Sequence, residues 1–145
     1  MQNRFTGGAD ALDLSEMPLL KAVSQDTARG AEFLINGKIV YAKGGGGDGG
    51  RGINVSVLDA NTGIRMSDTR NFDTWLAQGG FGGPHVNFQN LIAYLSSLPA
   101  GSIILLSIGD EGGFINPGTS SAWNDTNVEQ AYQALEALGS TKIRQ

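Results

Sequence analysis

Hydrophobic and polar residues alternate most clearly just after a glycine-rich stretch, over residues 51–58. A period of two along the chain is typical of a β-strand with one buried face. Asn61-Thr62-Gly63 then supplies turn residues, and residues 67–75 read as a second strand. We therefore predict two strands joined by a tight turn, in which the first strand buries Ile53, Val55 and Val57.

A second hairpin is predicted around the dipeptide Asn36-Gly37, between segments 31–35 and 38–42. Asparagine and glycine accept the positive φ values of a type I′ turn at little steric cost. Residues 1–30 are more polar, and we expect them to form an arm or linker. Within that arm, the spacing of apolar residues predicts one short helix over 15–23.

Two amphipathic helices are predicted downstream. Apolar residues at i, i+3, i+4 and i+7 in segment 87–97 mark one helix, which Pro99-Ala100-Gly101 ends. Thr126 and Glu129 have capping-box spacing at the start of the second helix, and Gly139 follows its end. The predicted buried stripes are Phe88, Leu91, Ile92 and Leu95 in the first helix, and Val128, Ala131, Leu135 and Leu138 in the second.

Residues 102–108 are apolar at both alternations, which predicts a central strand covered on both faces. Together these elements indicate an α/β fold of the α+β type, with a mixed or antiparallel β-sheet packed by two α-helices. The glycine-rich segments 44–50 and 76–86 are expected to be loops. The predicted organisation is an arm over 1–30 and one domain over 31–145.

Composition narrows the function. The chain has 145 residues, no cysteine, a formal net charge of -4 and a pI of about 4.8. Because no two basic residues are adjacent, we expect no nucleic-acid partner. The longest apolar run, 103–106, is too short for a membrane span, and the N-terminus lacks the pattern of a signal peptide. We therefore expect a soluble protein without a membrane partner.

Few residues in the sequence suggest a catalytic, metal-binding or cofactor-binding site. His85 is the single histidine, and we interpret it as a surface loop residue, since a lone histidine without thiols cannot build a structural zinc site. The glycines of 44–50 lead into a strand, whereas phosphate-binding loops lead into a helix. We expect no catalytic residues, no metal and no cofactor.

The chain contains the motifs RGINVSVLD, TG and DTRNFDT, followed in order by LP-x-G, D-E and ALGS. In these motifs it resembles the ILEI domain family, also called the GG domain. Its members include secreted cytokine-like proteins, a glycosyltransferase stem, hyaluronan-related membrane proteins and phage tail-fibre proteins. The resemblance implies the ILEI fold over 31–145. Secreted animal members carry disulfides, so the absence of cysteine disfavours that branch. The family continues past the ALGS helix with further strands that do not follow in this sequence. We expect either that the sequence is a fragment or that a partner, such as another copy, completes the open sheet edge.

The resemblance also implies a candidate sugar site. In the glycosyltransferase-stem branch, the arginine of GRG and the aspartate of D-E belong to a sugar-binding site, and they match Arg51 and Asp110. Glu111 and Trp75 complete the candidate set, since carboxylates bond hydroxyls and aromatic rings cover sugar faces. The alternative is structural: each acid caps a turn or pairs with Arg51, Arg65 or Arg70.

From these features we expect a non-enzymatic virion module that serves structure or host attachment, in a phage tail fibre or a tail-associated protein. Its partners would be other virion proteins or copies of itself, and a glycan. The alternative function is a carbohydrate-binding module that uses Arg51 and Asp110.

Overall fold

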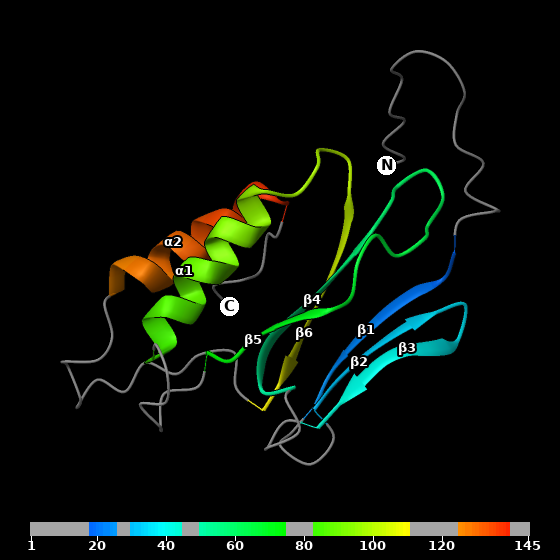
Figure 1. Cartoon of the computed structure of the whole chain (residues 1–145), viewed down its shortest axis with the longest axis horizontal. Helices are drawn as coiled ribbons and strands as arrows, with labels where there is room; N and C mark the ends of the chain where they lie inside the picture. Colours follow the sequence, from blue (N-terminus) through cyan, green and yellow to red (C-terminus); the bar gives the residue numbers. More distant parts are fainter. Residues whose placement is uncertain (1–17, 26–29, 45–49, 75–82, 111–124, 140–145) are drawn as a thin grey trace, which may run out of the picture.

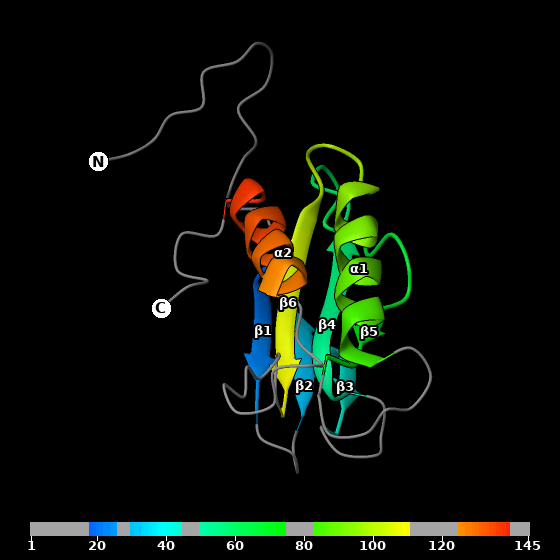
Figure 2. The ribbon, with the colours of Figure 1, turned by 90° about the vertical axis from the view of Figure 1, so that its left-hand side faces the viewer.

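The computed structural model describes residues 18–25, 30–44, 50–74, 83–110 and 125–139. They form two antiparallel three-stranded sheets and two helices, which confirms the α+β class. The two helices lie against one sheet, and the second sheet lies on the other side of it (Figures 1 and 2). The elements are β1 (Leu20–Ser24), β2 (Ala31–Ile35), β3 (Lys38–Lys43), β4 (Gly52–Leu58), β5 (Arg70–Phe72), α1 (Gly83–Ser96), β6 (Ile103–Gly109) and α2 (Asp125–Ala137).

The outer sheet has the order β1-β2-β3 and contains the predicted hairpin. Asn36 and Gly37 have φ values of 51° and 76°, as a type I′ turn requires. The predicted helix over 15–23 is wrong, because residues 20–24 form strand β1. Antiparallel pairing with β2 overrides the local helical spacing. The domain boundary at residue 30 stays a prediction, although β1 pairs with β2 across it.

The middle sheet has the order β5-β4-β6, and β4 is buried along its whole length. The prediction of a half-buried strand is therefore wrong for β4. Its polar residues Asn54 and Ser56 are 0% and 1% exposed because they face the outer sheet rather than solvent. The strand predicted over 102–108 is confirmed as β6, but its predicted central position in the sheet is wrong. Within the described ranges, β6 has a full strand partner only in β4.

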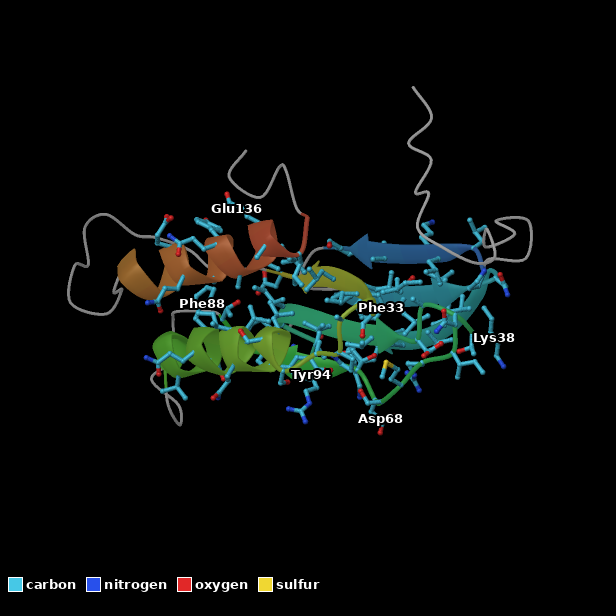
Figure 3. All side chains as sticks on the ribbon, turned by 90° about the horizontal axis from the view of Figure 1, so that it is seen from above. Phe33, Lys38, Asp68, Phe88, Tyr94 and Glu136 are labelled. Carbon is cyan, nitrogen blue, oxygen red and sulfur yellow. The ribbon has the colours of Figure 1, made fainter. Side chains whose placement is uncertain are left out.

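The main core lies between the middle sheet and the helices. It contains Ile53, Val55, Val57, Phe72, Phe88, Leu91, Leu95, Ala131 and Leu135. Figure 3 shows Phe88 between the two helices and Phe33 among the strands. The stripe of α1 is confirmed, with Ile92 partly buried against the core. In α2 the stripe is confirmed for Ala131 and Leu135, whereas Leu138 is 46% exposed; the side chain of Val128 lies outside the described residues.

Helix boundaries differ slightly from the expected ones. Helix α1 begins at Gly83, so His85 lies in its first turn and the prediction of a loop histidine is wrong. Helix α2 begins at Asp125, and the side chains of its predicted capping box stay untested. After α2, Gly139 has a φ of 96°, as predicted for a residue that ends a helix.

The two sheets are joined at one end by the chain that follows β1. The amide of Gln25 donates to the carbonyl of Ile108, and the amide of Asp110 donates to the carbonyl of Gln25, at 3.2 and 3.1 Å. The hydroxyl of Ser24 accepts a hydrogen bond from the amide of Ile108. This junction fixes the end of β6 next to the start of β4, where the candidate site residues Arg51 and Asp110 lie.

Candidate functional site

Glycines allow three chain segments to meet around Arg51. Gly52 has a φ of 88°, and a Cβ atom there would lie 2.2 Å from the carbonyl oxygen of Phe72. A Cβ on Gly109 would lie 2.3 Å from the carbonyl oxygen of Gly50. These distances are far below van der Waals contact, so close backbone packing next to Arg51 requires glycine at positions 52 and 109. Residues 45–49 of the predicted glycine loop lie outside the described residues.

The side chain of Arg51 forms a bidentate ion pair with Asp73, which follows β5. Its Nε atom lies 3.0 and 3.1 Å from the two carboxylate oxygens, and an Nη atom lies 2.5 Å from one of them. The hydrogen bond with Asp73 raises the pKa of Arg51 above its ordinary value, and the charges of Asp73 and Asp110 raise it further. The structural alternative for the acids is thus confirmed for Asp73.

Asp110 ends β6 on the same side of the molecule as Arg51. Its charge acts on Arg51, and its backbone has a φ of 65°, in the left-handed region that only a few per cent of non-glycine residues occupy. Gly52 pairs with Gly109 across β4 and β6, so Arg51 and Asp110 lie at the same end of the middle sheet. Their role in a sugar site stays a prediction. The other two candidate residues, Glu111 and Trp75, lie outside the described residues.

A buried amide network holds the backbone beneath Arg51. The side chain of Asn54 donates to the carbonyl of Gly50 at 2.7 Å, and it accepts hydrogen bonds from Tyr41 and Asn71. Asn71 also donates to the carbonyl of Arg51 at 2.8 Å. Burial raises the pKa of the Tyr41 hydroxyl. These polar partners therefore fix where Arg51 leaves the sheet.

Sequence reasoning missed this network. Asn54 looked like a solvent-facing residue of an alternating strand, because a single strand pattern does not reveal a second covering layer. The family motifs contained a hint of this network, since Asn54 lies in the GRGIN motif and Asn71 lies in the DTRNFDT motif.

Asp59 has a purely local role. Its carboxylate accepts hydrogen bonds from the amides of Asn61 and Thr62 and from the Thr62 hydroxyl, at 2.9 to 3.0 Å. The backbone hydrogen bond from Thr62 is the main cause that lowers the pKa of Asp59. Gly63 completes the turn with a φ of 65°. The prediction that acids cap turns is confirmed here.

The described ranges contain no group of three or more histidine, cysteine or acidic residues that could hold a metal ion. No helix in those ranges is long and apolar enough to cross a membrane.

The fold and the site define an α+β domain that presents an Arg51–Asp73 ion pair at one end of its middle sheet. Residues 51–145 match the ILEI family, described as Interleukin-like EMT inducer. The match covers more than half of the chain, so the protein belongs to the ILEI family. A search of curated proteins gave no match.

Proposed function

We propose that this ILEI domain is a non-enzymatic structural module of a phage tail fibre or of its attachment apparatus, located in the virion tail. It assembles with copies of itself or with other virion proteins. The observation that carries the proposal is a group of exposed apolar side chains near the β2–β3 turn and the turn after β4. We call it the apolar end; its residues are Leu19, Ile39, Ile64 and Met66, which are 72%, 54%, 67% and 48% exposed.

Several contacts bring these residues to one end of the molecule. The amide of Asn36 donates to the carbonyl of Leu19, and the amide of Leu19 donates to the side-chain oxygen of Asn36, each at 2.8 Å. A Cβ on Gly63 would lie 2.4 Å from the ring of Pro18. The side chain of Arg65 donates to the carbonyl of Val40 at 3.1 Å. The apolar end thus combines segments before β1, in β3 and after β4.

Exposed apolar side chains that gather in one region mark interaction surfaces, whereas single ones are ordinary. β3 adds an edge whose backbone has a strand partner on one side only within the described residues, and such edges pair with other chains. The carboxylates support a role without catalysis, because Asp59 is occupied by its turn and Asp73 by Arg51.

The test is the mass of the purified chain in solution, measured by light scattering over a range of concentrations. We expect an oligomer that the double substitution Ile39→Lys and Ile64→Lys converts to a monomer. Leu138→Lys is the matched control, because Leu138 is exposed at the end of α2, outside the apolar end. A chain that is monomeric, and that captures none of the other proteins of its virion, would refute the proposal.

A second candidate, a carbohydrate-binding module, is favoured by one specific observation. Arg51 and Asp110 lie close enough for the charge of Asp110 to act on Arg51, and an arginine beside carboxylates offers paired hydrogen bonds to hydroxyls. Binding of the chain to a glycan array would test it. Signals that persist in Arg51→Ala would exclude this site, and Arg65→Ala controls for the loss of a positive charge.

A further inference from the structure

A polar groove of about 570 Å³ lies between β5 and α1, open to solvent. Its walls carry Arg70 and Asn71 from the strand, and Asn87, Asn90 and Tyr94 from the helix. The volume is in the range of small-molecule sites. The helical residues follow one another at three- and four-residue intervals, so α1 turns an apolar stripe to the core and a polar stripe to the groove.

Arg70 is held in the groove by aromatic rings. Its guanidinium carbon lies 4.6 Å from the centre of the Tyr94 ring. The Tyr94 ring is itself fixed by Phe72, at 5.7 Å between ring centres. A guanidinium stacked on an aromatic face keeps the N–H groups at its edges available. Among the described residues, no carboxylate lies within ion-pair distance of Arg70.

The amide of Asn87 is oriented by the fold and leaves an acceptor in the groove. Asn87 donates its side-chain amide to the carbonyl of Asp73 at 2.7 Å, so its side-chain oxygen can accept a hydroxyl proton. The side chain of Asn71 points to the other face of β5, where it bonds Asn54. The side chain of Asn90 forms no hydrogen bond with any described residue, so both its donor and its acceptor functions are available.

We propose that this groove binds a saccharide unit that carries a carboxylate, such as a uronic acid. Arg70 pairs with the carboxylate through two parallel N–H donors, and the amides of Asn87 and Asn90 bond the ring hydroxyls. A carboxylate with several neighbouring hydroxyls matches one cation surrounded by neutral amides. A peptide fits less well, because peptide-binding grooves offer apolar pockets for side chains. The proposal does not depend on assembly through the apolar end.

The test is an NMR titration of the full chain with methyl β-D-glucuronide, followed through backbone amide signals. We expect shifts for β5 and for the groove side of α1, and none with the neutral methyl β-D-glucoside or with acetate. Arg70→Gln should abolish the shifts, whereas Arg65→Gln, which removes an arginine outside the groove, should keep them. Tyr94→Phe keeps the aromatic support, so it should retain binding, whereas Tyr94→Ala should weaken it at least tenfold.

Several outcomes would overturn the proposal. One is the absence of groove shifts with the glucuronide, in a sample whose spectrum is that of the folded chain. Equal shifts with the glucoside would show that the carboxylate is not recognised, and equal shifts with acetate would show that the sugar is not. Shifts that vanish in Arg51→Gln but survive in Arg70→Gln would assign the ligand to the Arg51 site. The groove does not include Ile39 or Ile64. Each of these results can therefore be interpreted whether or not the lysine substitutions at the apolar end abolish assembly.

Discussion

Arg51 lies just before β4, and Arg70 is the first residue of the neighbouring strand β5. The fold holds these two arginine side chains in different ways. Arg51 precedes β4 and gives its guanidinium to the carboxylate of Asp73. Arg70 begins β5 and rests on the Tyr94 ring, with no acidic partner among the described residues. An arginine fixed by an acid uses its donors within the protein, whereas one fixed by an aromatic face keeps them for a ligand. The same residue type is therefore held by an ion pair at one end of β5 and by an aromatic ring at the other.

The largest effect is expected where the backbone around Arg51 is most closely packed. Gly52→Ala would place a Cβ atom 2.2 Å from the Phe72 carbonyl oxygen in a residue with a φ of 88°. We expect the free energy of unfolding to fall by about 3 kcal/mol or more, as measured by urea denaturation. Gly101→Ala is the matched control, since Gly101 has a φ of 82° and open space around it; we expect a loss of about 1–2 kcal/mol there. Equal losses would show that close packing at Gly52 is unimportant.

The next effect concerns the network beneath Arg51. Asn54→Ala would leave the carbonyl of Gly50 and the hydroxyl of Tyr41 without a buried partner. We expect a loss of about 2–3 kcal/mol in the free energy of unfolding, because buried polar groups without partners are costly. Asn61→Ala removes an exposed amide and should change the free energy by less than about 0.5 kcal/mol. Similar values for the two variants would contradict a structural role for the network.

A smaller effect is expected for the ion pair itself. The side chains of Arg51 and Asp73 are 27% and 40% exposed, so solvent screens their attraction. Arg51→Ala should lower the free energy of unfolding by about 0.5–1 kcal/mol. The loss should shrink at high salt. Unfolding measured at low and high ionic strength checks this. A loss that is large and independent of salt would indicate that Arg51 acts through packing.

The smallest effect concerns Asp59, an acid held by backbone amides instead of an arginine. Its folded-state pKa lies below the ordinary value, because the carboxylate accepts the amide hydrogen of Thr62. Its contribution to stability is therefore present above the ordinary aspartate pKa of about 3.9, and it is lost as the pH falls through the lowered folded-state value. We expect Asp59→Asn to be less stable than the parent chain at neutral pH, and this difference to vanish in acid. Urea unfolding along a pH series checks it, and a difference independent of pH would contradict it.

Local patterns predicted the elements whose information lies in neighbouring residues. Asn36-Gly37 predicted the hairpin because its turn needs positive φ values, and these are found. The spacing of Phe88, Leu91 and Leu95 predicted the buried face of α1, because helical periodicity fixes which residues share a face. The chain motifs also indicated the family, which the match over residues 51–145 confirms.

The candidate site was only partly predictable. Arg51 and Asp110 were identified through motif words, whereas Asp73 was one of several acids that suited more than one role. Distances between side chains on different strands depend on register and on sheet order, and no spacing along the chain encodes them. The bidentate pairing of Arg51 with Asp73 therefore became visible only in the structure.

The hairpin turn, the two helices and the α+β class could be predicted from the sequence, because they follow from backbone preferences and from hydrophobic periods within short segments. Three features became visible only in the folded chain: residues 20–24 form a strand, both faces of β4 are buried, and Arg70 rests on Tyr94. Each of these three features depends on a neighbour distant in sequence. A second sheet that covers β4 turns its polar residues into buried ones, and no pattern within the strand can reveal that cover.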